Sequence, residues 1–232
     1  MGKGFTLVEL AIVLIIIGLL ISGVLVAQSM INTAKIQKAV RLIAQCEVAI
    51  SNFRNKYQQL PGDSNYFSNP GDNNGDVDYG ERFDTWAHLS QAENFKTPLG
   101  ADYQHIGWSG NARVPNVNCP DFDLPSLKGI TGLRCLTMRN IVSWNLAPYI
   151  LWETGDLGNA AGMDQALRPR DMFALDKKMD DGNGNTGAVA SGWNNGLCKN
   201  GGGVYQNLGS DNFYCSGYSF MGAASGYPEY KY

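Results

Sequence analysis

Residues 4–27 read GFTLVELAIVLIIIGLLISGVLVA, and this stretch decides how the N-terminal part of the chain folds. From Phe5 to Ala27 it contains one charged residue, Glu9. At ~1.5 Å per residue, a helix of this length reaches ~35 Å, which is enough to cross a hydrocarbon core of ~30 Å. A carboxylate in that core costs about 3 kcal/mol or more, so Glu9 needs a partner.

An ordinary membrane anchor or a secretory signal would account for the apolar run alone. A signal peptidase site requires small residues after an apolar stretch of roughly 7 to 15 residues. The nearest candidate, the Leu25–Ala27 segment, has a large residue where a small one is needed. Neither alternative accounts for Gly4, Phe5 and Glu9.

The string GFTLVE at residues 4–9 resembles the class III signal of type IV pilins and type II secretion pseudopilins. In that family a prepilin peptidase cuts after the glycine and methylates the new amino terminus. The resemblance implies that residues 1–4 are a leader, that Gly4 is the cleavage-site residue, and that Phe5 is the methylated first mature residue. It also implies an inner-membrane precursor that an assembly machinery polymerises through its N-terminal helices into an extracellular or periplasmic filament.

Glu9 is the predicted assembly residue. A cut after Gly4 creates an α-amino cation at the start of an apolar helix, and Glu9 of a neighbouring subunit lies one helical turn further along. Two charges that are each costly alone neutralise each other between subunits. Without Glu9, the neighbour's amine would be left unpaired.

One helix is predicted over residues 5–57, about 80 Å long at ~1.5 Å per residue. No proline occurs before Pro61. Beyond the membrane-spanning half, residues 5–27, apolar side chains recur mostly at steps of three and four. They are Ile36, Ala39, Val40, Ile43, Cys46, Ile50, Phe53 and Tyr57. This stripe would pack on a sheet.

Residues 58–232 are expected to form a globular head, since about 175 residues can enclose one core. The head holds twelve Lys or Arg against nineteen Asp or Glu, net −7, whereas residues 1–57 are net +4. Binding to polyanions depends on phosphate neutralisation by Lys and Arg. The acidic head therefore argues against nucleic acid as a partner.

The head sequence predicts both helices and strands. Helices are expected over Glu81–Phe95 and Pro169–Asp180, and strands over Tyr103–Trp108, Arg134–Trp144 and Phe213–Phe220. Leu146–Trp152 is expected at a sheet edge because it contains Pro148, and Ala188–Ala190 is too short to assign. The mixture predicts an α+β fold. The pilin resemblance implies a long N-terminal helix packed on an antiparallel sheet head.

Five cysteines follow, of which Cys46 lies in the helix stripe and is predicted to be a buried free thiol. The other four, Cys119, Cys135, Cys198 and Cys215, lie in the head, on the oxidising side of the membrane where disulfides persist. Four cysteines allow three connectivities, and chain order favours Cys119 with Cys135 and Cys198 with Cys215. A disulfide near the carboxyl terminus is also common in pilins, which favours the second pair.

Two loops place side-chain oxygens at alternating positions, as a calcium loop does. The first carries Asp72, Asn74, Asp76 and Asp78, but Phe83 occupies the twelfth position, where a calcium loop has glutamate. The second carries Asp181, Asn183 and Asn185, within a Lys178–Gly187 stretch that resembles the K-x-D-D-G-x-x-x-T-G segment of some pilin-like heads. Calcium is the predicted ligand of these loops, and Asx-rich turns without metal are the alternative.

A hydrolase is an alternative of a different class. Gly62-Asp63-Ser64 resembles the nucleophile block of GDS-type hydrolases, and Asp102 with His105 forms a D-x-x-H pair. Yet Ser64 follows a helix and lies only 41 residues before His105, too few for the intervening sheet. His88 and His105 are expected to be packing or surface residues, without zinc spacing. No enzymatic activity is predicted.

The predicted function is that of a structural subunit of a type IV pilus or pseudopilus filament. The alternative is a minor pilin that acts as an adhesin, whose acidic head binds a surface ligand. The aromatic tail residues Tyr227, Tyr230 and Tyr232 would be its contact residues. The sequence does not distinguish a pilus from a secretion pseudopilus, or a major from a minor subunit.

Overall fold

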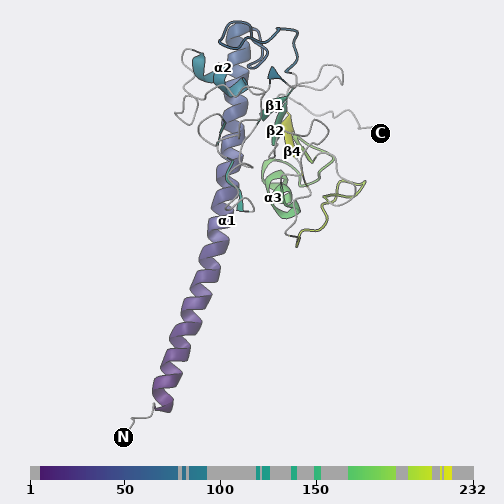
Figure 1. The fold of residues 1–232 in the computed structure, drawn as a ribbon. Helices are drawn as coiled ribbons and strands as arrows, with labels where there is room; N and C mark the ends of the chain where they lie inside the picture. The colour runs from purple at the N-terminus through teal and green to yellow at the C-terminus, as the bar shows by residue number, and fades with distance from the viewer. Residues whose placement is uncertain are drawn as a thin grey trace.

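A computed structural model describes most of the N-terminal third of the chain and several segments of the rest. The described residues are 6–77, 80–81, 84–92, 119–120, 122–125, 137–139, 149–152, 167–191, 198–210, 215 and 217–220. One long helix, α1, extends from near the N-terminus into the region where the other elements gather (Figure 1). The molecule thus has a long helical stem, α1, and a head that surrounds the C-terminal part of this helix.

Helix α1 spans Leu7–Tyr57, 51 residues, and ends at the residue where the sequence predicts its end. It forms because the segment has no proline and is capped at both ends. Thr6 is the N-cap, and Gln58 adopts a left-handed conformation (φ 56°) from which its N–H donates to the Arg54 carbonyl oxygen at 2.9 Å. The positive charges of Arg54 and Lys56 in the last turn stabilise the helix, because the C-terminal end of its dipole is negative. The predicted long apolar N-terminal helix is confirmed.

The two halves of α1 have different surroundings. Every large apolar side chain from Leu7 to Ile31 is exposed, and in the described part of the chain α1 is the one helix long and apolar enough to cross a membrane. Burial begins at Ile36 and follows one face. The buried residues are Ile36, Ala39, Leu42, Ile43, Cys46, Ala49, Ile50 and Phe53. The predicted stripe therefore marks the face that meets the head, with Leu42 and Ala49 as additional members.

In the described part of the head, two shorter helices lie against α1. Helix α2 spans Thr85–Gln91 inside the predicted 81–95 segment, and the chain becomes extended at Ala92. Helix α3 spans Pro169–Met179, with proline in the first turn, where the missing N–H costs nothing. It packs against both α1 and strand β3, and so connects the stem helix with the sheet.

Within the described residues, four short strands pair antiparallel in the order β1-β2-β4-β3. They are β1 Thr137–Arg139, β2 Tyr149–Trp152, β3 Val189–Ser191 and β4 Gly217–Phe220. The prediction that residues 146–152 form an edge strand is wrong, because β2 lies between β1 and β4. The described strand begins at Tyr149, after Pro148 in the sequence, so none of its described residues is a proline that would lack a ladder N–H. The predicted strand at 103–108 lies outside the described residues.

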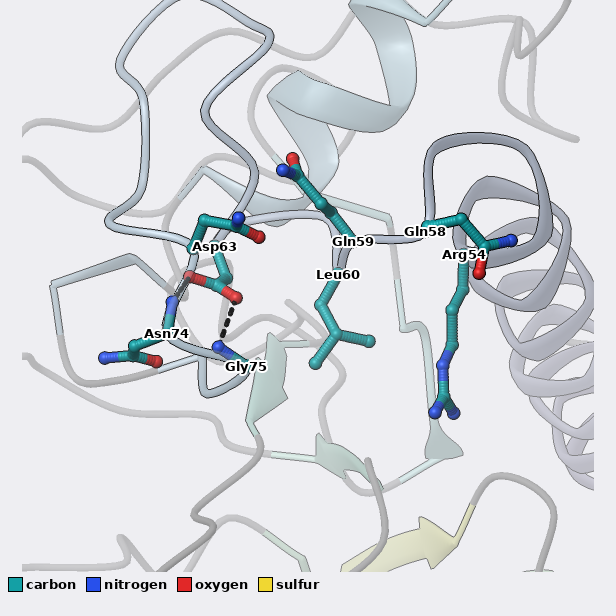
Figure 2. Close-up of a pocket in the computed structure, with 8 residues that line it drawn as sticks. Arg54, Gln58, Gln59, Leu60, Asp63, Asn74 and Gly75 are labelled. Carbon is teal, nitrogen blue, oxygen red and sulfur yellow. Dashed lines mark hydrogen bonds between the residues drawn. The ribbon is translucent and has the colours of Figure 1, made fainter.

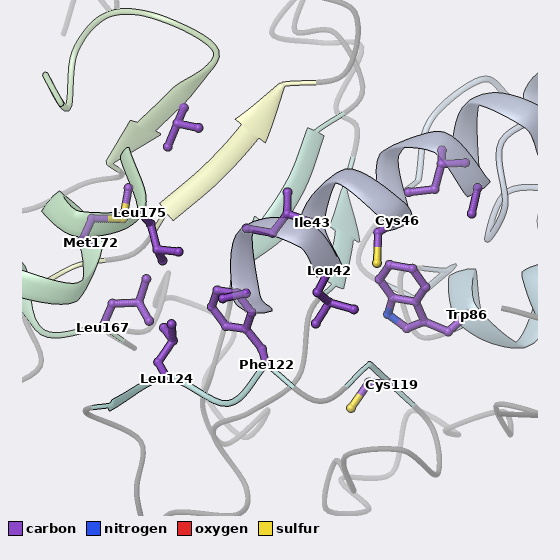
Figure 3. Close-up of a cluster of buried hydrophobic side chains, with 14 of the residues drawn as sticks. Leu42, Ile43, Cys46, Trp86, Cys119, Phe122, Leu124, Leu167, Met172 and Leu175 are labelled. Carbon is purple, nitrogen blue, oxygen red and sulfur yellow. The ribbon is translucent and has the colours of Figure 1, made fainter. Parts of the chain in front are cut away.

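The core lies between the buried face of α1, helix α2, the 119–125 segment and α3. Figure 3 draws members of one buried hydrophobic cluster from these elements, namely Leu42, Ile43 and Cys46 of α1, Trp86 of α2, Phe122 and Leu124 of the 122–125 segment, and Met172 and Leu175 of α3. The largest fully buried side chains are Phe53, Phe122, Ile43, Ile50, Leu89 and Leu124. At the lower end of this core, Lys35 Nζ lies 3.0 Å from Asp123 Oδ1. Among the described residues, buried contacts between the head and α1 thus extend from about Lys35 to the end of the helix, roughly six turns at 3.6 residues per turn.

Candidate functional site

The start of α1 holds the Glu9 carboxylate in a capping box. Glu9 Oε2 accepts hydrogen bonds from the Thr6 backbone N–H and the Thr6 hydroxyl, both at 2.8 Å. In return, the Glu9 N–H donates to Thr6 Oγ1 at 3.2 Å. This box was not predicted, although the T-x-x-E spacing of Thr6 and Glu9 is its signature. In the single chain, the Glu9 carboxylate therefore bonds to donor groups at the N-terminus of its own helix. Gly4 and Phe5 lie outside the described residues.

The Glu9 carboxylate stands at one end of a continuous apolar surface. Over the four to six turns that follow, apolar side chains on all sides of α1 are exposed, as with Leu14, Leu19 and Leu25 at 69%, 70% and 68%. Soluble monomers rarely expose contiguous apolar patches of more than a few hundred Å². This surface requires a cover of lipid or of other apolar helices.

Asp63, which is 1% exposed, holds the first oxygen-rich loop in place through hydrogen bonds. Its carboxylate accepts the backbone N–H groups of Asn74 (3.1 Å) and Gly75 (2.9 Å). Burial raises the pKa of the Asp63 carboxyl, and these N–H donors oppose that rise. Asp63 was not among the predicted metal ligands, because it lies before the run of alternating oxygen residues.

The predicted ligands of this loop bond largely to one another. The Asp72 carboxylate accepts both the backbone N–H and the side-chain amide of Asn74, and Asn74 Oδ1 accepts the N–H of Asp76. These are Asx turns. Carboxylate oxygens of Asp63, Asp72 and Glu81 also lie within 4.8 Å of one another. Asp78 lies outside the described residues, and calcium binding by this loop stays a prediction.

In the second loop the predicted ligands also close turns. Asp181 Oδ1 accepts the N–H of Asn183 at 2.7 Å, and its Oδ2 accepts the Thr186 hydroxyl. Asn183 Oδ1 accepts the N–H of Asn185 at 3.0 Å. The Lys199 ammonium donates to Asn185 Oδ1 and, at 2.8 Å, to the Gly184 carbonyl oxygen.

Lys199 thus brings a positive charge to the loop from 14 residues further along the chain. Burial lowers the pKa of the Lys199 ammonium, while the Asp176 carboxylate opposes this. No pattern in the sequence connects Lys199 with the loop, because the contact forms only after folding. Calcium binding here also stays a prediction.

Beneath this loop lies a buried carboxylate, that of Asp176 on α3, which is 0% exposed. Its Oδ2 accepts the Tyr205 hydroxyl at 2.7 Å and its Oδ1 accepts the Gly182 N–H at 3.1 Å. Burial raises the pKa of Asp176 to about 6, against the effect of these two donors, and Asp181 and Asp180 add to the rise.

We expect Asp176 to make the head more stable as the pH falls. A carboxyl whose pKa is raised in the folded state contributes stability that is lost as pH rises from its ordinary value, 3.8, through about 6. Two pKa units correspond to roughly 3 kcal/mol. Asp176→Asn should therefore raise the free energy of unfolding at pH 7.5, and the gain over wild type should shrink as the pH falls to 4.5. Urea denaturation of both proteins at the two pH values measures it. A pH-independent difference would contradict the assignment to Asp176.

The residues of the hydrolase alternative serve the fold of the 59–69 turn. Ser64 is 0% exposed and its hydroxyl donates to Gln59 Oε1 at 2.7 Å. His88, also 0% exposed, accepts the Gly62 N–H on Nδ1 at 3.0 Å. Its Nε2 faces the carbonyl oxygens of Ser68 and Asn69 at 3.2 and 3.0 Å. His88 is thus a packing residue that joins α2 to the turn, while Asp102 and His105 lie outside the described residues.

A disulfide joins Cys198 to Cys215, as predicted. Cys119 is also disulfide-bonded, and its predicted partner, Cys135, lies outside the described residues. Cys46 is a buried free thiol, as predicted, and burial raises its pKa. The aromatic tail with Tyr227, Tyr230 and Tyr232 lies outside the described residues.

Comparison with known proteins identifies the N-terminal part of the chain. The family model for the prokaryotic N-terminal methylation motif matches residues 2–25. No curated protein and no solved structure matches the chain. The match covers the Gly4-Phe5 junction, Glu9 and most of the exposed apolar turns of α1, so the predicted class III signal is confirmed.

Proposed function

We propose that this chain, which carries the class III signal of type IV pilin-like precursors, is a structural subunit of a type IV pilus or pseudopilus filament. A class III signal implies processing by prepilin peptidase and association with the membrane. The observation that carries the proposal is the coincidence of this signal at residues 2–25 with exposed apolar side chains from Leu7 to Ile31. Such a surface can lie in lipid before assembly and against other copies of α1 afterwards.

The role we assign to Glu9 is an exchange of partners. In the single chain its carboxylate accepts two hydrogen bonds from Thr6 at the helix N-terminus. After cleavage, the amine of Phe5 in an adjacent subunit would offer a full positive charge. In a low-dielectric helix bundle, an ion pair is worth more than a cap, because each charge is otherwise unpaired. The exchange would fix the axial register of one helix against the next.

The proposal extends to the architecture of the head, a pilin-like sheet on which the long helix packs. It is supported by α3, which lies against both α1 and strand β3, and by the antiparallel pairing of the four strands. In a filament the apolar turns of α1 would form the centre, and the acidic head would face outward.

Processing gives the direct test. Intact-mass analysis of the membrane-extracted protein should show loss of Met1 to Gly4 and gain of one methyl group. Gly4→Val should block both changes, because the peptidase requires the small residue at the cut, whereas Gly2→Ala in the same leader should leave them intact. An uncut leader in a strain with active prepilin peptidase would contradict the proposed function.

A further inference from the structure

A pocket of about 300 Å³ lies where α1 ends, between its last turn and the 73–75 loop. Its walls include Arg54, Gln58, Leu60, Asp63, Asn73 and Asn74. Figure 2 shows the Arg54 side chain on one side of Leu60, and Asp63 with Asn74 and Gly75 on the other. This volume is at the small end of the range for ligand pockets, the size of a single small molecule.

Arg54 supplies an uncommitted cation. Its side chain is exposed, and among the described residues its guanidinium has no hydrogen-bond or ion-pair partner. A guanidinium presents its N–H donors in a planar fork that matches a carboxylate with two parallel hydrogen bonds. This wall of the pocket is therefore suited to a ligand with one carboxylate.

Asp63 supplies acceptors on the opposite wall. Its two carboxylate oxygens take the N–H groups of Asn74 and Gly75. The Asn73 N–H also acts on this carboxylate, and since a carboxylate offers about four lone-pair sites, about one remains for a hydroxyl donor. The side-chain amide of Asn73, which makes no hydrogen bond to any described residue, can both donate and accept. Leu60, 6% exposed, adds a small apolar surface between the two walls.

We propose that this pocket binds a small sugar acid, through its carboxylate to Arg54 and through its hydroxyl groups to Asp63 and Asn73. The C–H face of the ring would rest on Leu60. The exposed Asp72 and the half-buried Asp76 lie on the same loop and would repel a polyanion, which favours a ligand with a single negative charge.

This binding is independent of filament assembly. Arg54 lies 23 residues beyond Ile31, the last residue of the exposed apolar run, which is ~35 Å along the helix at 1.5 Å per residue. Detergent or lipid that covers the apolar turns therefore does not reach the pocket. Failure of the filament proposal would leave this inference unaffected, and the reverse also holds.

The test uses the full-length protein in detergent micelles and saturation-transfer NMR with galacturonate as the probe. Galacturonate should bind, and neutral galactose should bind about tenfold more weakly or not at all, since it lacks the charge for Arg54. Arg54→Gln should weaken galacturonate binding about tenfold or more, while loss of its charge at the helix C-terminus should lower the melting temperature by no more than about 4 °C. Arg41→Gln, at an exposed arginine of the same helix, is the matched control and should change nothing.

Three outcomes with the two sugars would overturn the proposal. They are absence of galacturonate binding, equal binding of galactose, and unchanged binding to the Arg54→Gln variant. Glycine serves as a further probe, because its ammonium could take the place of the sugar hydroxyls at Asp63. Tighter binding of glycine than of galacturonate would show that the pocket prefers a zwitterion, and would likewise contradict a sugar acid.

Discussion

Replacing Glu9 with alanine is expected to remove the subunit from filaments while leaving cleavage after Gly4 and folding of the head intact. In a filament core, loss of one partner of a buried ion pair typically costs ~3 to 5 kcal/mol. The other partner, the amine of Phe5 in the next subunit, would stay charged among apolar side chains. Glu9→Gln should also assemble poorly, because an amide cannot neutralise an amine. Sheared surface fibres, quantified by immunoblot against total subunit, measure the effect.

The capping box supplies the control for this experiment. Glu9→Ala removes two interactions at once, the proposed pair with a neighbour and the bonds within its own helix to Thr6. Thr6→Val keeps the carboxylate but removes the hydroxyl that caps the Glu9 N–H. Losing a cap costs ~1 kcal/mol, so Thr6→Val fibres should form at near-normal abundance. Normal fibres from Glu9→Ala, or equal loss of fibres in both variants, would contradict the intersubunit role of Glu9.

The long helix could be predicted from sequence because its signals are local. A proline-free run, an apolar span and then one stripe at helical spacing all report on neighbouring residues. The predicted end at Tyr57 agrees with the structure, and Gln58 there takes the left-handed conformation that ends a helix. The class III signal is local too, and its match to residues 2–25 depends on a short stretch.

The contacts that organise the head could not be predicted in the same way, because they join distant parts of the chain. Strand β3 is only three residues long, and it is defined by its pairing with β4, about 28 residues later. Lys199 reaches Asn185, and Tyr205 reaches Asp176, 29 residues away, across turns whose course only the fold sets. Gly62 and His88 meet over 26 residues for the same reason. Alternating Asx residues predicted oxygen-rich loops but did not show which groups they would contact.

The disulfide between Cys198 and Cys215 connects these non-local contacts. Cys215 exchanges backbone hydrogen bonds with Leu167, just before α3, and the chain after it enters β4 two residues later. Cys198 precedes Lys199, and the Cys198 carbonyl accepts the N–H of Gln206 at 2.8 Å. The bridge therefore attaches the 198–210 segment, with Lys199 and Tyr205, to the sheet and to the start of α3.

Replacing both Cys198 and Cys215 with alanine should accordingly lower the melting temperature of the head by roughly 6–12 °C. The two residues are 17 positions apart, and closing a loop of that length stabilises by about 3 kcal/mol. For a domain of 150–250 residues, each kcal/mol shifts the melting temperature by about 2–4 °C.

Cys46→Ala is the control, since it removes a buried thiol that bonds to no other cysteine and should cost only about 1 kcal/mol. Circular dichroism melts without reductant, on wild type, the double variant and Cys46→Ala, measure the three melting temperatures. An unchanged melting temperature in the double variant would contradict this role of the disulfide. It would mean that the backbone hydrogen bonds between Leu167 and Cys215 and the other contacts hold residues 198–210 against the sheet without the bridge.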